Sequence, residues 1–195
     1  MRIHRKLFPI FLFITVFSIV VGQDFDFSPL RWGEGEIEKY LKMDTRNFPD
    51  NPVANGKNGA VTTTFHSAAS RAGLEALNQG GTSVDAAMTA ALTQITLNAG
   101  SVVSFFGVIT MVHYDAATGE MVSMDAAWNT VQDELDPMSI PGPKTVDVDA
   151  MWNPREVSSR TALVGGFMRG VEAANERYGK LPFKSLFDPA IYFAE

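Results

Sequence analysis

The sequence predicts an α/β (α+β) chain in which helical layers flank antiparallel strands, in two or four layers, rather than a doubly wound parallel sheet. Apolar side chains recur at helical spacing over residues 67–79 and again after Thr82. Residues 108–114 and 120–126 alternate between polar and apolar side chains and are joined by a short loop that ends in glycine. This is the pattern of a β-hairpin. A further helical pattern over residues 161–178 follows the hairpin.

Residues 1–22 have the three parts of a secretory signal peptide. Basic residues precede a charge-free apolar run over 7–21, and Gly22 supplies the small residue before the polar Gln23. An uncleaved membrane anchor is the alternative. A membrane span needs about 20 apolar residues, whereas this run is shorter and contains Pro9. We therefore expect an exported protein, in a periplasm, at a cell surface or outside the cell, with no membrane association after cleavage.

The net charge of the exported part excludes some classes of binding partner. Removal of residues 1–22 takes away three of the 16 Lys and Arg and none of the 22 Asp and Glu, which leaves 13 positive against 22 negative side chains. An acidic surface repels phosphate backbones and anionic lipid, so we expect no nucleic-acid binding and no membrane-surface binding. The chain has no cysteine, so packing rather than disulfides must hold it together.

The first part of the exported chain, residues 23–58, is predicted to be an irregular lead-in. Aromatic and acidic residues mix without a period, proline and Asn-Gly pairs interrupt the run, and a short helix fits only around residues 36–41. The β-branched residues 59–65 predict a strand. The helix over residues 67–79 should end at the glycine pair 80–81, which is a typical C-terminal cap.

A second helix should begin at Thr82, because Thr82 and Asp85 have the spacing of a capping box. Its four alanines leave little side-chain bulk and allow close approach of a neighbouring layer, and its threonines form a slightly polar opposite side. After the hairpin, proline-rich residues 136–154 predict a long extended loop. A short helix is expected near 183–187, and a last one that begins at Asp188 has no stop signal before the sequence ends.

The sequence contains no group of residues that identifies a catalytic or metal site. One of the three histidines lies in the signal segment; His66 falls at a strand-to-helix junction and His113 on a half-exposed hairpin strand. The glycine pairs at 80–81 and 165–166 lack the lysine and serine of a phosphate-binding loop. They indicate a helix cap and close helix packing, respectively. We assign no catalytic residue, no cofactor and no metal.

Three motifs carry a resemblance to a known family. The longest is HSAASRAGLEALNQGGTSVDAAM over residues 66–88, and it is supported by MVHYDAATG at 111–119 and by TALVGGF at 161–167 followed by RYGKLP at 177–182. Together they resemble the N-terminal part of the large subunit of the gamma-glutamyltranspeptidase family, also called gamma-glutamyltransferases or glutathione hydrolases, which act in glutathione metabolism.

The resemblance implies an N-terminal-nucleophile hydrolase fold, an αββα sandwich with antiparallel strands, of which residues 59–195 hold an incomplete N-terminal part. Such proteins are made as one precursor that cuts itself before a threonine. The new N-terminal threonine then attacks a γ-glutamyl amide, with its own amine as base. Because that threonine lies downstream of the matched region, the resemblance implies that this chain is inactive alone. Its partner would be the missing C-terminal part or small subunit, and its substrate a small γ-glutamyl-type or other amide.

Two departures from the family pattern concern the substrate pocket. The glycine-rich loop of the family is reduced to Gly107 within residues 104–109. The arginine that holds the glutamyl α-carboxylate in the family falls on Ala127, so a methyl group replaces a bidentate cation. Trp128 and Asn129 are therefore the candidate substrate-binding residues of a differently shaped pocket. The alternative is that Trp128 is a buried packing residue.

Three hypotheses follow for the function of the chain. The first is a piece of a secreted gamma-glutamyltransferase-like enzyme whose nucleophile lies elsewhere. The second is a non-catalytic secreted binding or interaction module that kept the scaffold. The third, an unrelated exported α/β binding protein, is disfavoured by the length of the motif match.

The mature N-terminus is predicted to be Gln23, because Gly22 closes the charge-free run at a position that signal peptidase accepts. The intact mass of the exported protein measures this directly. An exported species that retains residues 1–22 would identify the segment as an anchor instead.

Overall fold

The computed structural model describes residues 24–43, 53–98, 103–130, 132–136 and 164–195. The predicted signal peptide and nearly all of the predicted extended loop over 136–154 lie outside these residues. In the part of the chain that is described, no helix is both long and apolar enough to cross a membrane.

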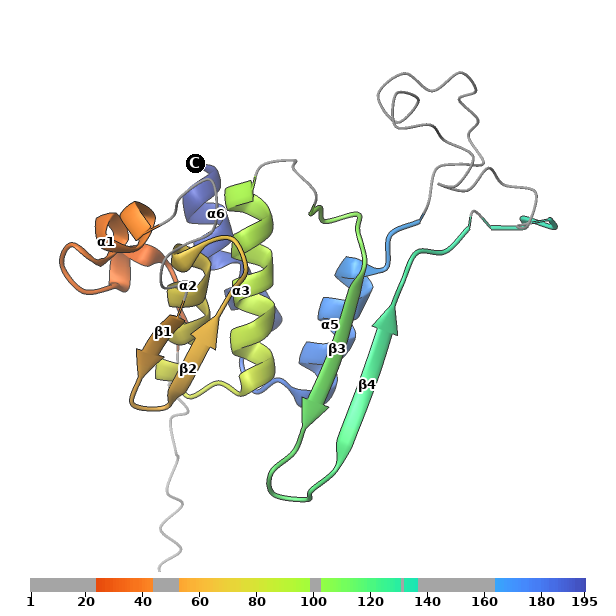
Figure 1. The fold of residues 1–195 in the computed structure, drawn as a ribbon, viewed down its shortest axis with the longest axis horizontal. Coiled ribbons are helices and arrows are strands. Elements are labelled where there is room, and N and C mark those ends of the chain that lie inside the picture. The colour runs from red at the N-terminus through yellow and green to blue at the C-terminus, as the bar shows by residue number, and fades with distance from the viewer. Residues whose placement is uncertain (1–23, 44–52, 99–102, 131, 137–163) are drawn as a thin grey trace, which may run out of the picture.

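Two closely packed helices, α2 (Ser67–Asn78) and α3 (Ser83–Asn98), form the centre of the fold (Figure 1). The predicted glycine cap of α2 is confirmed: Gly80 has a left-handed φ of 86°, and the N–H of Gly81 donates to the carbonyl of Ala76 at 2.9 Å. A Cβ at Gly73 would lie 2.7 Å from the carbonyl oxygen of Ala86. The alanine-rich surface of α3 therefore allows the close approach that the sequence predicts.

The threonine side of α3 is buried rather than solvent-facing. Thr89 and Thr93 are fully inaccessible, and the hydroxyl of Thr93 donates to the carbonyl of Thr89 at 2.8 Å. The helices α5 (Phe167–Tyr178), η5 (Phe183–Phe187) and α6 (Asp188–Ala194) pack on α3 in addition to α2. Hence, in the described part of the chain, α3 contacts four other helices, whereas its face at Ser83 and Ala87 is exposed.

Asp85 joins these helices through a fully buried carboxylate. The predicted capping box is present, since the N–H of Thr82 donates to Asp85 at 2.8 Å and the N–H of Asp85 donates back to the Thr82 hydroxyl at 3.2 Å. The same carboxylate also accepts from the side-chain amide of Asn175 at 3.1 Å and from the N–H groups of Lys180 and Leu181 at 3.0 and 3.5 Å. The long-range half of this network is not apparent in the sequence.

The lead-in over residues 23–58 is more ordered than predicted. It contains α1 (Glu36–Met43), where a short helix was expected, and also a strand, β1 (Val53–Gly56), that pairs antiparallel with β2 (Gly59–Thr62). The prediction of an irregular segment is wrong for residues 53–56. The register pairs Gly56 with Gly59, so Lys57 and Asn58 form the two-residue loop of a tight hairpin. Turn-forming residues also occur in irregular segments, and the residue pattern alone does not separate the two.

The second hairpin is confirmed. Strands β3 (Ile109–Tyr114) and β4 (Met121–Ala126) pair antiparallel, and Gly119, the glycine that ends the connecting loop, has a left-handed φ of 76°. One face of this hairpin lies on α5, where a Cβ at Gly170 would stand 2.4 Å from Cγ2 of Ile109 (Figure 1). Val112, Tyr114 and Met121 on the opposite face are exposed.

The helix predicted over residues 161–178 begins later than expected, at Phe167. Val164 instead forms an isolated antiparallel bridge with Asn129. Glycine has a low helix propensity, and the glycine pair at 165–166 packs against other backbone segments instead of extending the helix. Residues 161–163 lie outside the described part of the chain.

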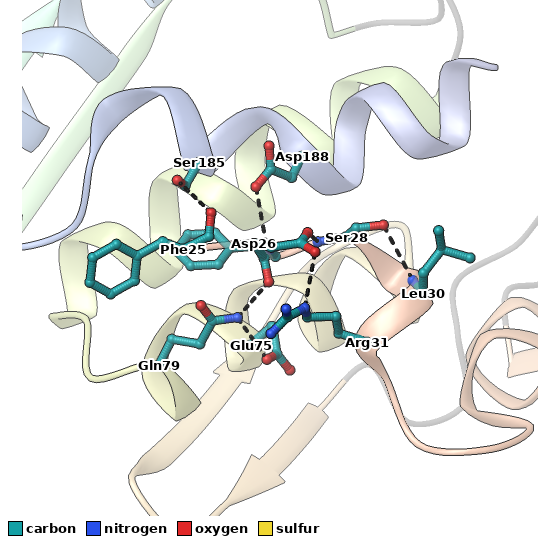
Figure 2. Close-up of polar contacts among 10 residues, drawn as sticks. Phe25, Asp26, Ser28, Leu30, Arg31, Glu75, Gln79, Ser185 and Asp188 are labelled. Atoms are coloured by element: carbon teal, nitrogen blue, oxygen red, sulfur yellow. Dashed lines mark hydrogen bonds and ion pairs between the residues drawn. The ribbon is translucent and has the colours of Figure 1, made fainter. Parts of the chain in front are cut away.

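An N-terminal strap, residues 24–32, lies across α2 and the η5–α6 segment (Figure 2). The N–H of Phe27 donates to Asp188 at 3.1 Å, and the side-chain amide of Gln79 donates to the carbonyl of Asp26 at 2.6 Å. The hydroxyl of Ser185 donates to a further strap carbonyl at 3.2 Å. Because the Phe27 side chain is fully buried, the strap is part of the core.

Arg71 fixes the next part of the lead-in to α2. Its guanidinium is buried, pairs with Glu36 at 2.8 Å and Glu75 at 2.9 Å, and lies 4.8 Å from the centre of the Trp32 ring. Burial is the largest single influence on Glu36 and favours its neutral form. The hydrogen bonds from Arg71 and from the N–H of Gly33, together with the charges of Arg71 and Lys39, outweigh it and hold the pKa of Glu36 below its usual value. The cluster thereby keeps α1 beside α2.

Replacing Asp85 with alanine should destabilise the chain by about 3–5 kcal/mol, because it leaves several buried donors without an acceptor. The shift in the urea unfolding midpoint measures the effect. Asp125→Ala is the matched control, since Asp125 is exposed on β4 and should change stability by less than about 0.5 kcal/mol. Equal losses for both variants would show that the Asp85 network is not specific.

Asp188→Asn should stabilise the chain at neutral pH. Burial, followed by the charges of Asp26 and Asp24, raises the pKa of Asp188 despite the hydrogen bond from Phe27. An acid whose pKa is higher in the folded state than in the unfolded state stabilises the fold while it is protonated, at pH values below its unfolded pKa. This contribution to stability is lost as the pH rises through the folded pKa. Asparagine keeps an acceptor for Phe27 without the charge. The thermal midpoint of the variant should therefore exceed that of the wild type at pH 7 and approach it near pH 3.

Asp115→Asn is the control of opposite sign. The N–H of Ala117 is the largest of the influences that lower the pKa of Asp115, so this carboxylate stabilises the fold above its unfolded pKa and the contribution is lost in acid. Its replacement should lower the midpoint at pH 7. A thermal midpoint of Asp188→Asn that lies below the wild-type midpoint at pH 7 would contradict the prediction for Asp188.

Candidate functional site

Three segments meet beyond the end of β4 and form a surface that we call the hairpin-end platform, residues 104–107, 126–130 and 164–167. Asn129 and Val164 exchange two backbone hydrogen bonds, each 2.9 Å long. The N–H of Phe167 donates to the carbonyl of Gly107 at 3.0 Å. The platform therefore joins the turn before β3, the end of β4 and the start of α5.

Glycines allow these segments to come together. A Cβ at Gly165 would lie 1.9 Å from the carbonyl oxygen of Phe106, and one at Gly166 would lie 2.5 Å from the carbonyl oxygens of Ala126 and Ala127. The sequence predicts close packing at this glycine pair, and it occurs. However, the glycine pair packs against the backbone around the hairpin rather than against a helix. Its role is therefore to let the three segments of the platform pack closely.

The structure places both predicted substrate-binding residues on the platform surface. Trp128 is 56% exposed, so it is not a buried packing residue in this chain. Asn129 is exposed, and its side-chain oxygen accepts from the N–H of Thr130 at 2.9 Å. Ala127 is exposed beside them. Their role in substrate binding stays a prediction.

Two further apolar residues on the platform were not identified from the sequence. Phe106 is 84% exposed and Val164 is 52% exposed. Phe106 follows another phenylalanine, and that neighbour, Phe105, packs edge-on against Phe167 with ring centres 6.4 Å apart. The sequence does not distinguish the packed ring from the exposed one, because only the backbone turn assigns them to opposite sides.

The remaining candidates have structural surroundings. The carbonyl of His66 accepts from the N–H of Ala69 at 3.1 Å at the start of α2. The half-buried His113 ring lies 4.7 Å from the ring of Tyr178. Among the described residues, no group of three His, Cys, Asp or Glu side chains could hold a metal ion. These positions add no chemistry to the platform.

A second surface feature is a groove of about 400 Å³ between β2 and α3. Residues 60–64 line one side, and Ser83, four alanines and Gln94 of α3 line the other. The Thr62–Thr64 run thus belongs to this groove and is remote in sequence from the platform. The side chains that line it are neutral and mostly small, so no titratable group of the described residues lies in the groove.

The fold and the candidate site together define the class of protein. Helices pack on antiparallel hairpins, and the hairpin-end platform forms where a glycine pair allows close backbone packing at the end of one hairpin. The gamma-glutamyltranspeptidase family model matches residues 69–195. The chain therefore belongs to the gamma-glutamyltranspeptidase family.

Solved structures agree with this assignment. The chain is 27% identical to gamma-glutamyltranspeptidase from Helicobacter pylori, with a TM-score of 0.55, over 74% of this chain and 39% of that one. It is 25% identical to the enzyme from Pseudomonas nitroreducens in complex with L-DON, with a TM-score of 0.54, over 72% of this chain and 40% of that one. The predicted family and α/β class are confirmed, and this chain spans about 40% of the length of these structures.

Proposed function

We propose that this chain is the N-terminal part of an exported gamma-glutamyltransferase-like protein that catalyses acyl transfer to an amine or to water. The observation that carries the proposal is the family match over residues 69–195 combined with a solvent-facing platform at Trp128 and Asn129. Export follows from the signal-like residues 1–22. The family relationship supports a threonine nucleophile supplied by polypeptide that this chain does not contain.

The partner in this proposal is the rest of the family fold, either as a continuing chain or as a small subunit. This proposal is supported by the finding that the chain covers only 40% and 39% of the two solved enzyme chains. The outer face of the β3–β4 hairpin presents Val112, Tyr114 and Met121 to solvent. Apolar side chains on one face of a two-stranded hairpin favour a covering layer.

The platform would form one wall of the acyl-donor pocket. Trp128 offers an apolar ring and a single N–H donor, and Asn129 offers a backbone already fixed by Val164. Ala127 supplies no charge for a carboxylate. The substrate is therefore a small γ-glutamyl-type or other amide, with its donor group held by shape and hydrogen bonds more than by an ion pair.

A non-catalytic exported binding module on the same scaffold is the second candidate. The observation that favours it is Ala127, where the family resemblance places an arginine. Loss of that cation removes the main charged contact expected for a glutamyl donor. Retention of the scaffold without the chemistry is consistent with the separation of fold from function.

The isolated mature chain should not turn over a chromogenic γ-glutamyl anilide, because its threonines lie inside the chain and lack the free amine that would serve as base. Co-expression with the part of the Helicobacter pylori enzyme that this chain does not cover should restore turnover. The same Helicobacter pylori part expressed alone is the control. A stable complex without turnover of any amide substrate would favour the binding-module alternative.

In that complex, Ala127→Arg should improve the affinity for the γ-glutamyl substrate by about 10- to 150-fold, since a charge-assisted pair with a carboxylate contributes about 1.5–3 kcal/mol. The ratio of KM values measures this. Ala116→Arg, in the exposed hairpin loop, controls for added charge. An unchanged KM would mean that another residue already holds the carboxylate or that the pocket lies elsewhere.

A further inference from the structure

The groove between β2 and α3 has one wall that is a strand edge. In the described residues, β2 pairs only with β1, and Figure 1 shows β2 on the side of β1 that is nearer to α3. The second edge of β2 therefore faces the groove. An edge strand presents unpaired N–H and C=O groups that can pair with another strand.

This edge is short, but it lacks the charged residues and prolines that commonly prevent pairing. Residues 59–64 read GAVTTT, without a charge or a proline. Proteins commonly guard permanently open edges with lysine, proline or a bulge. The side chains of Ala60, Thr62 and Thr64 are exposed, and threonine is well suited to a strand interior.

The opposite wall is shaped for close approach. Ser83, Ala87, Ala91 and Gln94 line it from α3, and only Gln94 is long. The eleven residue steps from Ser83 to Gln94 span about 16 Å at 1.5 Å per residue. The strand β2 ends at Thr62, and the four residue steps from residue 60 to residue 64 span at most about 13 Å at 3.3 Å per residue. The helical wall is therefore long enough to accommodate one extended segment of about five residues.

We propose that this groove receives a β-strand from the polypeptide that completes the family fold, paired with the free edge of β2. Alternate side chains of the incoming strand would face Ala87 and Ala91 and would have to be small or slender. The inference rests on the proposed function, because its occupant comes from the part of the family chain that has no counterpart here, which is about 60% of the length of the matched structures. Main-chain pairing supplies the affinity and the alanine wall supplies the selectivity.

The test is hydrogen–deuterium exchange in residues 60–64, measured for the mature chain alone and in the complex with the uncovered part of the Helicobacter pylori enzyme. Pairing should slow exchange there by at least about 100-fold. Ala87→Arg, which places a long side chain in the groove, should reduce this protection about tenfold or more. Ala116→Arg should leave it unchanged. Arginine is a good helix former, so thermal unfolding of the chain alone should not change with Ala87→Arg.

The outcomes separate the strand site from the proposed function. A complex in which residues 60–64 exchange as fast as in the chain alone overturns the strand site and leaves the proposed function standing. Protection that Ala87→Arg does not weaken also overturns it. Failure to form any complex would count against both the strand site and the proposed function. Protection in the chain alone that grows with its concentration would identify a second copy as the occupant and would overturn the proposed source.

Discussion

The arrangement of the described chain depends on the buried carboxylate of Asp85. It caps α3 and accepts from donors some ninety residues later, at Asn175, Lys180 and Leu181. A buried charge is tolerated only when donors surround it, so the carboxylate and the end of α5 require each other. Because the β3–β4 hairpin lies on α5 at Gly170, the position of the platform follows from this one contact.

A second constraint acts at the other side of the helix pair. The N-terminal strap is hydrogen-bonded both to α2 and to the η5–α6 segment, and Arg71 holds α1 through two carboxylates. The earliest and latest described segments are consequently parts of one core. Phe27 and Leu186 are among its fully buried side chains.

The strands are covered less completely than the helices. The β3–β4 hairpin has one face on α5 and one face in solvent, and β2 has one paired edge and one edge on the groove. The exposed residues of the platform belong to the same pattern. The chain covers about 40% of the length of the solved family structures, and under the proposed function these surfaces are where the remaining polypeptide would pack.

The sequence by itself determined the features that depend on neighbours within a few residues: the α2 cap at Gly80, the capping box at Thr82, the loop at Gly119 and the family motif. Each is set by local backbone preference or by side-chain spacing. Tertiary structure alone decided that Asp85 binds the end of α5 and that Trp128 is exposed. Those outcomes depend on segments brought together by folding, and local periodicity carries no record of contacts between residues ninety positions apart.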